Sequence, residues 1–406
     1  MKVKIIMNSN PFFAASASAN RWLTVIEGLK ELNTELVILI VGNYQSKAEQ
    51  ENFEKTSHFN GIEFQYLTTK IIGGIWQRRY HKYIGKHIQF IKTKHSIRKE
   101  LSGFDGIVWS QNDLSLWKII TSIQNKSFKL ICEMSEFLDI HHFNKGNTLH
   151  KRAGDAKQAY FENTYINKLD GFVLMTKTLI SHYSNFNNHP PLLHLPMTVD
   201  LERFHKIDNS PSEFKSPYIA FVGSMNDAKD GVDILIEAFY NFVDDHPEIK
   251  LYLVGAWNYD VPKYLGRIKE LKLEDRIKWV GEYPRDIIPS IIGNAELLVL
   301  PRPDSKQAQG GFPTKLGEYL ATGRPVCATT VGEIPDYLTD NKSVFFAKPS
   351  SVDSFADAMG KALSNPQGAK IIGKKGRDVA EKYFNKDIQS KLLHNFLHQL
   401  YNENSK

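Results

Sequence analysis

Short apolar runs alternate along the chain with longer segments in which apolar residues recur at helical spacing. In the first half, the apolar runs are KVKIIMN, LVILIVG, IEFQYL, GIVWS, KLICEM, GFVLM and LLHLP. The helical segments between them include 20–32, 77–101, 153–169 and 178–184. Strands that alternate with amphipathic helices in this way are typical of a parallel sheet with helices on both faces. The pattern predicts an α/β fold of the doubly wound type.

The same rhythm restarts in the second half with YIAFVG, LYLVG, IKWVG, ELLVLP, PVCATT and VFFA. At 406 residues the chain is long for one compact core. Two Rossmann-like domains are therefore predicted, 1–200 and 201–385, with a polar, proline-bearing joint at 198–216.

The last segment, 386–406, has apolar residues at Ile388, Leu392, Phe396 and Leu400. This spacing predicts a C-terminal helix, and we expect it to cross back onto the N-terminal domain.

Composition narrows the class of protein. The chain is 42% hydrophobic and 24% charged, which is ordinary for a folded globular protein. Its two cysteines, Cys132 and Cys327, lie in apolar runs, so a disulfide framework is not expected. We expect instead that the protein resides in a reducing compartment. The apolar start is too short for a signal peptide, and no window resembles a membrane helix. These features predict a cytoplasmic protein.

The strongest candidate for chemistry is the segment GGFPTKLGEYLATGRPV, which follows the predicted strand ELLVL. A helix is expected to begin near Thr314, so that the backbone N–H groups of Thr314, Lys315 and Leu316 can bind a diphosphate. Glu318 lies four residues after Thr314 on the same helical face, where its carboxylate suits the two hydroxyls of a ribose. The alternative is one more strand-to-helix turn with a solvated glutamate.

The second half resembles the retaining glycosyltransferases of family 4, which have the GT-B fold of two Rossmann-like domains facing a central cleft. The matching pieces are YIAFVGSMNDAKDGVDILIEAF, LYLVG, LKLEDRIKWVGEYP and GGFPTKLGEYLATGRPVCATTVGEIPDYL. They span about residues 195–400, in the order and spacing of the family. The resemblance implies an enzyme that needs neither a metal nor another cofactor. Its co-substrate would be a nucleotide-diphosphate sugar of the UDP or GDP type.

The resemblance also implies roles for single residues. Glu318 matches the glutamate that holds the donor ribose, and Thr314, Lys315 and Leu316 match the amides around the pyrophosphate. The turn that meets the nucleobase includes Tyr283 and Pro284. Other matched positions on the nucleotide side are Gly223 and Ser224, and those on the donor-sugar side are Gln309, Gly310, Gly311, Phe312 and Pro313.

The chain departs from the family pattern at three positions. Gly310 stands where an acidic residue usually lies near the donor sugar. Ser224 and Asp230 stand where the family has arginine and lysine, respectively. Lys229 is the nearest cation and Lys315 the second candidate, so these lysines are expected to stabilise the leaving group as point charges.

The first half offers candidates for the acceptor side. The first strand ends near Asn10, and small residues up to Ser16 precede a helix. A later strand ends in LICEMSEFLDIHHF, which contains Glu133, Glu136 and His141. A carboxylate or histidine there could bind or deprotonate an acceptor hydroxyl, and Glu136 and His141 are the candidates for catalysis. A polar loop with solvated charges is the equal alternative.

Residues 70–99 carry nine Lys or Arg and no Asp or Glu, whereas the whole chain has a net charge of +6. The rest of the chain therefore sums to 6 − 9 = −3. We expect this segment to bind an anionic membrane surface or a lipid-pyrophosphate acceptor. Nucleic acid is not an expected partner, because aromatic stacking platforms and basic grooves are absent.

These observations predict a metal-independent, retaining hexosyltransferase of surface-polysaccharide type. Its acceptor would be a lipid-linked or polysaccharide glycan at the inner face of the plasma membrane. No ligand constellation for a metal is visible in the sequence. Two alternatives stay open. A nucleotide-sugar epimerase can use the same double fold, and a non-catalytic binding subunit would explain the missing acidic residue and arginine.

Overall fold

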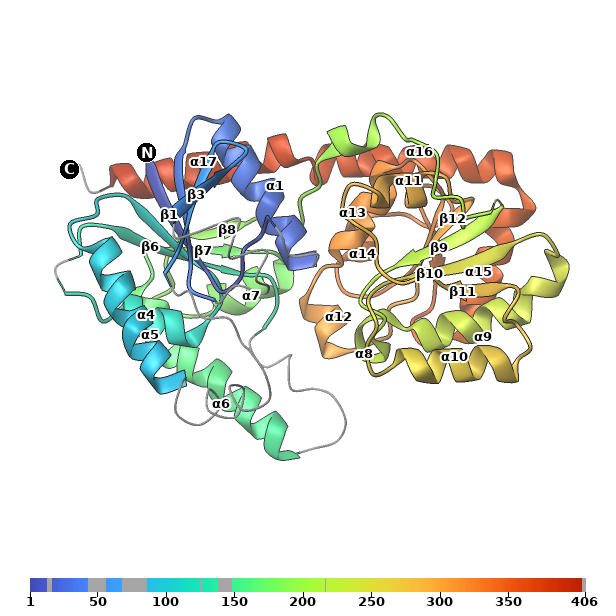
Figure 1. Cartoon of the computed structure of the whole chain (residues 1–406), viewed down its shortest axis with the longest axis horizontal. Helices are drawn as coiled ribbons and strands as arrows, with labels where there is room; N and C mark the ends of the chain where they lie inside the picture. The colour runs from blue at the N-terminus through green and yellow to red at the C-terminus, as the bar shows by residue number, and fades with distance from the viewer. Residues whose placement is uncertain are drawn as a thin grey trace. The chain divides into compact units, whose positions relative to one another are not determined.

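The computed structural model describes residues 1–12, 17–42, 56–67, 86–124, 126–137, 148–215 and 217–403. These residues form two compact units, which are coloured along the chain in Figure 1. Unit 1 comprises Met1–Leu195 and Ser390–Lys406, and unit 2 comprises Pro196–Gln389. The first unit thus ends a few residues before the expected boundary at 200, and it includes the end of the chain.

Unit 1 is built on an eight-stranded sheet in the order β3-β4-β2-β1-β5-β6-β7-β8. The strands are β1 (Lys2–Met7), β2 (Glu35–Ile40), β3 (Thr56–Phe59), β4 (Ile62–Tyr66), β5 (Ile107–Ser110), β6 (Lys129–Met134), β7 (Gly171–Leu174) and β8 (Leu192–His194). The edge strand β3 runs antiparallel to β4, and the other pairs are parallel. Because β1 pairs with both β2 and β5, the strand order reverses there, as in a doubly wound fold.

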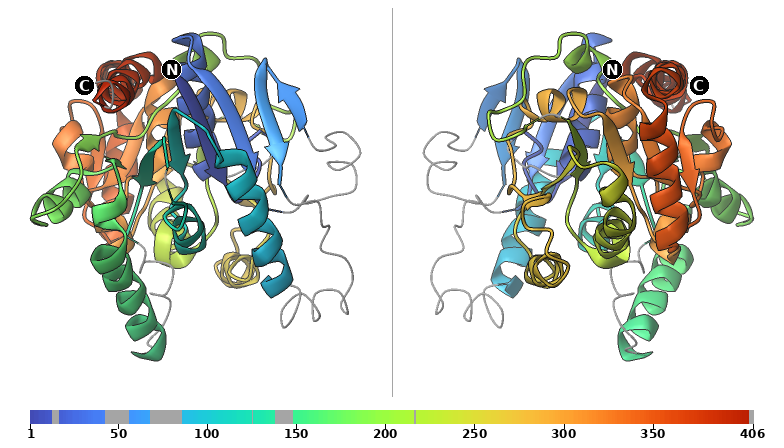
Figure 2. Two further views of the ribbon diagram at one scale, coloured as in Figure 1. Left: turned by 90° about the vertical axis from the view of Figure 1, so that its left-hand side faces the viewer. Right: turned by 90° about the vertical axis from the view of Figure 1, so that its right-hand side faces the viewer.

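Helices cover both faces of this sheet. They are α1 (Ala17–Glu31), α4 (Lys86–Leu101), α5 (Leu114–Ile120), α6 (Thr148–Thr164), η3 (Ile166–Lys168), α7 (Lys177–Ser184) and α17 (Lys386–Asn402). One core lies under α1 and α17, and the other lies under α4 to α7. The first strand and the last helix lie side by side, so the two ends of the chain are close together (Figures 1 and 2).

The C-terminal helix α17 buries only part of the apolar stripe that the spacing indicated, namely Phe396 and Leu400 and not Ile388 and Leu392. Leu393, Leu397 and Leu400 are buried in the core of unit 1. Ile388 and Leu392 are 42% and 48% exposed, respectively. Residues four apart drift around a helix by about 40° per step, so a chain of such steps does not stay on one face.

Unit 2 has six parallel strands in the order β11-β10-β9-β12-β13-β14. The strands are β9 (Tyr218–Val222), β10 (Lys250–Val254), β11 (Ile277–Trp279), β12 (Leu297–Leu300), β13 (Val326–Thr329) and β14 (Phe345–Ala347). The order reverses between β9 and β12. Crevices at the carboxyl ends of two such strands are where open α/β sheets bind ligands.

The helices of unit 2 also lie on both faces of the sheet (Figure 1). They are η4 (Leu201–Phe204), α8 (Asp227–Asp230), α9 (Val232–Phe242), η5 (Val243–Asp245), α10 (Val261–Glu270), α11 (Ile288–Gly293), α12 (Lys306–Gly310), α13 (Thr314–Ala321), α14 (Ile334–Tyr337), α15 (Val352–Ser364) and α16 (Pro366–Tyr383). Helices α9, α10 and α15 bury one apolar cluster against the sheet. Helix α13 lies on the other face with α11 and α16 and begins just after the end of β12 and the short helix α12.

Candidate functional site

The loops that follow β9 and β12 meet where the strand order of unit 2 reverses. Gly231, which follows α8, has φ +68°, and a Cβ added to it would lie 2.0 Å from the carbonyl oxygen of Pro301. Glycine accommodates both the left-handed backbone and the close approach. The loop from Gly223 and the loop from Pro301 therefore enclose the carboxyl ends of both strands.

Lys315 reaches from the first turn of α13 back to the end of β9. Its Nζ lies 2.6 Å from Oδ1 of Asp230 and 4.5 Å from the centroid of the Phe221 ring. A Cβ added to Gly223 would lie 2.1 Å from this Nζ. Gly223, at the end of β9, thus leaves space for the ammonium group. Gly223 and Lys315 were both predicted to contact the donor nucleotide, and they lie next to each other.

From the sequence, Asp230 was notable only because it stands where the family has lysine. It is 1% exposed, and its Oδ2 accepts a hydrogen bond of 2.5 Å from Ser224 Oγ. Burial alone would raise the pKa of Asp230, but the ion pair with Lys315 and the bond from Ser224 bring it down to about 2. Asp230 is therefore a carboxylate at neutral pH, and Ser224 is occupied as its partner.

Glu318 lies one turn further along α13, and it is paired with an arginine that sequence reasoning missed. Arg203 Nη1 donates a 2.8 Å hydrogen bond to Glu318 Oε1. Its Nη2 donates to the carbonyl oxygen of Arg285 at 2.6 Å. The side chains of Arg203 and Glu318 are 14% and 18% exposed. The only signal for this contact in the sequence was that Arg203 lies in the polar joint at 198–216.

One of the three backbone N–H groups that were predicted to bind a diphosphate at the start of α13 already has a partner. The Leu316 N–H donates to the carbonyl oxygen of Pro313 at 3.0 Å, so this amide is used within the helix start. Thr314 and Lys315 occupy the first two positions of the helix, and Pro313 precedes them without a side-chain cap. The amides that remain for a diphosphate are therefore those of Thr314 and Lys315 rather than all three.

The expected loop after β12 contains the short helix α12. Ser305 caps this helix by accepting a bond from Ala308 N, and Gly310 is its last residue. Gln309 is exposed and donates to Asp304 Oδ1 at 2.7 Å. A serine cap followed by residues that tolerate a helix explains why this segment folds as a turn of helix rather than as open loop.

Three further donor-sugar candidates, Gly311, Phe312 and Pro313, are buried. The ring of Phe312 packs against those of Tyr337 and Phe384, with centroids 5.6 Å and 5.4 Å away. Phe312 therefore contributes to the interior of unit 2, where it anchors the segment that leads into α13.

The predicted nucleobase turn follows β11. Its Tyr283 hydroxyl donates a hydrogen bond to the Glu213 carboxylate, and its ring packs against Phe214. Burial, together with the bond to Glu213, raises the pKa of Tyr283 to about 12, so this residue stays a phenol at neutral pH. Pro284 is exposed next to it. Arg203 bonds to the backbone of Arg285, so this turn lies beside Glu318.

In unit 1, two acceptor-side candidates are part of the packed interior. Asn10 is 5% exposed; its Nδ2 donates to the Tyr66 hydroxyl and its Oδ1 accepts from Phe12 N. Glu133, at 4% exposure, accepts a 2.5 Å bond from Nε of Arg21. Glu136 lies just beyond the end of β6 and is half-buried. Ser16 and His141 lie outside the described residues.

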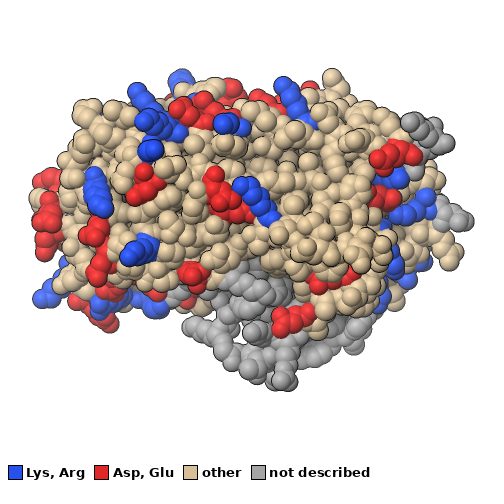
Figure 3. Space-filling model, turned by 180° about the vertical axis from the view of Figure 1, so that it is seen from behind, with Lys and Arg blue, Asp and Glu red and all other residues tan. Residues whose placement is uncertain are grey.

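Only part of the basic segment 70–99 is described, namely residues 86–99 within α4. Lys92, Arg98 and Lys99 are exposed on this helix, and Ile91 beside them is 66% exposed. Figure 3 shows one face of the molecule, where cations and anions are mixed and several Lys and Arg lie together at the right-hand edge. None of the described helices is long and apolar enough to cross a membrane.

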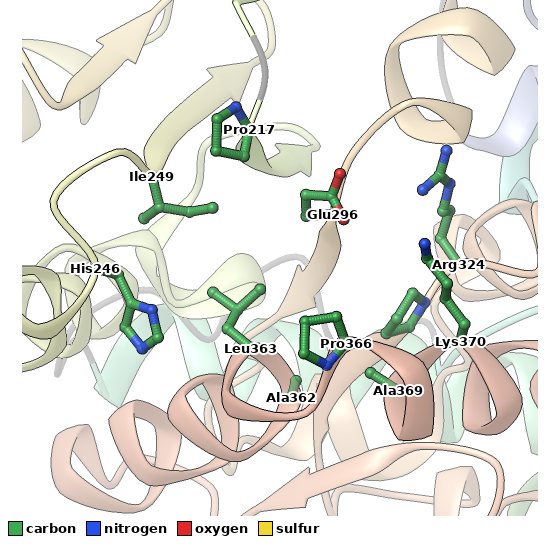
Figure 4. A pocket seen from close by; sticks show the side chains of 11 residues that line it. Pro217, His246, Ile249, Glu296, Arg324, Ala362, Leu363, Pro366, Ala369 and Lys370 are labelled. Atoms are coloured by element: carbon green, nitrogen blue, oxygen red, sulfur yellow. The ribbon is translucent and has the colours of Figure 1, made fainter.

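No cluster of three or more His, Cys, Asp or Glu able to hold a metal occurs within the described ranges. A cavity of about 220 Å³ lies elsewhere in unit 2, and Figure 4 shows its lining. Pro217, Glu296 and Pro325, which line it, precede β9, β12 and β13. The cavity is thus at the amino ends of these strands, at the opposite edge of the sheet from Lys315 and Glu318.

Residues 216–365 match the model of the family described as Glycosyl transferases group 1. This range runs from β9 to α15, and it includes both Lys315 and Glu318. This part of unit 2 is therefore similar to a glycosyltransferase group 1 domain, and the two units have the GT-B fold.

Curated relatives match over part of their length. A GDP-mannose-dependent monoacylated alpha-(1-6)-phosphatidylinositol monomannoside mannosyltransferase of Corynebacterium glutamicum is 27% identical over 240 residues. That match covers 54% of this chain and 61% of the relative. A D-inositol 3-phosphate glycosyltransferase of Corynebacterium jeikeium is 23% identical, and the match covers 51% of each chain. The chain thus spans about half to three fifths of these relatives.

Solved structures match the whole fold. Sucrose-phosphate synthase from Thermosynechococcus elongatus superposes with a TM-score of 0.79 at 15% identity, covering 99% of both chains. The Anabaena protein HepE in complex with UDP-glucose gives a TM-score of 0.72 at 14% identity, covering 98% of this chain and 100% of HepE. At this level of identity the likeness concerns the fold alone.

Proposed function

We propose that the protein is a retaining glycosyltransferase of family 4. It would transfer a hexose from a nucleotide-diphosphate sugar to a hydroxyl group of a lipid-linked or polysaccharide glycan, without a metal. The observation that carries this proposal is the arrangement on α13. Lys315 is directed to the end of β9, and Glu318 lies one turn away, held by Arg203.

This arrangement suits the two halves of a nucleoside diphosphate. The ammonium of Lys315 and the N–H groups at the start of α13 offer positive charge where a diphosphate would lie. Glu318 has one oxygen bonded to Arg203, and a carboxylate has about four lone-pair sites, so it can still accept from ribose hydroxyls. The turn of Tyr283 and Pro284 lies on the Glu318 side and would receive the base.

The chemistry of the proposal needs stabilisation of a leaving group. As the bond between the sugar and the diphosphate breaks, negative charge builds up on the departing phosphate oxygen, which takes the proton of the attacking hydroxyl. Lys315, Lys229 and the helix amides would neutralise this charge. Gly310 cannot hold a sugar hydroxyl through a side chain, so donor-sugar contacts would rest on the backbone and on neighbours such as Gln309.

The proposal of a lipid-linked acceptor rests on exposed basic side chains of unit 1. The exposed Lys92, Arg98 and Lys99 suit an anionic membrane surface or a lipid pyrophosphate. One relative is named for action on a phosphatidylinositol mannoside, which is a lipid-anchored acceptor. We therefore place the enzyme at the inner face of the plasma membrane, with polysaccharide biosynthesis as its context.

The proposal is tested by incubating the protein with a panel of UDP- and GDP-sugars and measuring nucleotide release with and without glycan acceptors. Acceptor-dependent release supports the transferase. Interconversion of sugars without an acceptor would instead indicate an epimerase. A nucleotide sugar that raises the melting temperature but is never turned over would indicate a binding subunit.

A further inference from the structure

Lys315 is held in place by residues that belong to the first strand and helix of unit 2. A lysine side chain has four rotatable bonds and loses about 2 kcal/mol of entropy when it is fixed. Here the end of that side chain lies over the Phe221 ring, fills the space left by Gly223 and contacts Asp230 at 2.6 Å. The ammonium group is thus fixed before any ligand arrives.

Asp230 is itself held rigidly. Its Oδ2 accepts from Ser224 Oγ at 2.5 Å and from the Asn226 backbone N–H at 3.4 Å. Its own N–H donates to the Asn226 carbonyl at 2.7 Å, and the chain turns sharply at Gly231 directly after it. A carboxylate that is 1% exposed and has these bonds cannot swing away to solvent without breaking them.

The charged groups that face Lys315 come from two other segments. Lys229 and Asp230 belong to α8, and Arg302 follows the end of β12. Burial lowers the pKa of Lys315, and the positive charges of Lys229 and Arg302 lower it further. Asp230 is the group that opposes them and raises the pKa of Lys315. Without Asp230, the ammonium would therefore lose its proton at a lower pH.

We propose that Asp230 is a positioning residue that keeps Lys315 charged and directed at the diphosphate subsite. This inference rests on the proposed function, since it assigns a cation to the leaving group. It adds that Lys315 is held in place by an acid at the end of α8. Asp230 would not touch the substrate and would act only through Lys315.

The test measures binding of UDP, GDP, ADP and dTDP by calorimetry at pH 8 and pH 9.5, where the ligand phosphates are fully ionised. The change in the parent's affinity between the two pH values is the baseline, because the bases of UDP, GDP and dTDP also lose protons in this range. Asp230→Asn should bind about tenfold more weakly at pH 8, because the lysine loses its orientation. At pH 9.5 it should lose more affinity than the parent does between the two pH values, because without Asp230 the amine of Lys315 gives up its proton at a lower pH.

Two further variants separate this effect from general damage. Asp275→Asn makes the same chemical change at an exposed position in the loop before β11 and should bind as the parent does at both pH values. Ser224→Ala removes one bond to Asp230 but no charge, so it should weaken binding at pH 8 without adding a pH dependence. Melting temperatures of all variants report whether each is folded.

The outcomes distinguish the two proposals. A parent that binds a nucleoside diphosphate, with Asp230→Asn equal to it at both pH values, overturns the positioning role alone. A loss in folded Asp230→Asn that is the same at pH 8 and pH 9.5 also overturns it, because the charge of Lys315 would then not depend on Asp230. A parent that binds none of the four nucleotides overturns the proposed function and this inference with it.

Discussion

Replacing Glu318 by alanine tests the ribose contact, and the structure sets the size of the expected effect. A hydrogen bond to a charged group contributes about 1.5–3 kcal/mol. The Glu318 side chain is 18% exposed, so water replaces the lost acceptor poorly. We expect donor binding to weaken by about 1.5–3 kcal/mol, which is about 10- to 150-fold in Kd.

The same change should affect folding only modestly. Arg203 loses its carboxylate partner but keeps its bond to the Arg285 carbonyl. Because Arg203 keeps this second bond and neither side chain of the pair is fully buried, the loss of stability should be about 1 kcal/mol. For a unit of this size that lowers the melting temperature by about 2–4 °C. A weak binder with a nearly parental melting temperature would therefore report a local effect.

Arg203→Leu tells whether this arginine acts through Glu318. Alone it should weaken binding of UDP or GDP by less than Glu318→Ala does, because the carboxylate remains but is no longer oriented. In the Glu318→Ala background it should add little further loss, since contacting residues are not additive. Glu274→Ala, an exposed glutamate before β11, serves as the matched control. If folded Glu318→Ala bound nucleotide as tightly as the parent in calorimetry, the ribose contact would be wrong.

Three other predictions concern the reaction and its location. Lys229→Ala should lower turnover more than Lys229→Arg in a nucleotide-release assay, because the proposed role is positive charge beside the leaving group. Chelation with EDTA should leave turnover intact, since the leaving-group charge is assigned to lysines and amides. The protein should co-sediment with anionic vesicles at low salt, because each exposed cation contributes about 1 kcal/mol of attraction and salt screens that attraction. Replacing Lys92, Arg98 and Lys99 by Glu should abolish the co-sedimentation.

Each of these three predictions has an outcome that would contradict it. Equal turnover for both Lys229 variants and the parent would leave the charge to Lys315 and the amides. Activity lost in EDTA and restored by Mg²⁺ or Mn²⁺ would overturn metal independence. Vesicle binding that survives the charge reversals on α4, or that falls equally when the exposed Lys374 and Lys375 of α16 are reversed, would exclude a specific basic surface.

The central parallel strands were readable from the sequence because they are buried on both faces. LVILI, KLICEM and LLVL appear as continuous apolar runs, and they form β2, β6 and β12. The antiparallel strand β3 was not predicted, because its sequence TSHF has little apolar character. As an edge strand that pairs on one side only, β3 is held by its hairpin with β4 rather than by burial.

The presence of a helix could also be predicted from neighbouring residues alone, whereas the face that the helix buries could not. The apolar spacing predicted a helix from Lys386, and α17 begins there. It could not tell which of several overlapping apolar stripes would pack, because that depends on the surface that receives the helix. The core of unit 1 accepts Leu393 and Leu397 and leaves Ile388 exposed.

At the site, the sequence by itself determined the local pieces: a strand, the start of α13 after it, and Glu318 on the same helical face as Thr314. Those pieces follow from residues within a few positions of one another. The partners of Lys315 and Glu318 were decided only by the tertiary structure, because Asp230 and Arg203 are 85 and 115 residues away along the chain. A local pattern cannot encode such contacts. The Lys315–Asp230 contact exists because the sheet order brings the ends of β9 and β12 together, and the Arg203–Glu318 contact exists because η4 packs against α13.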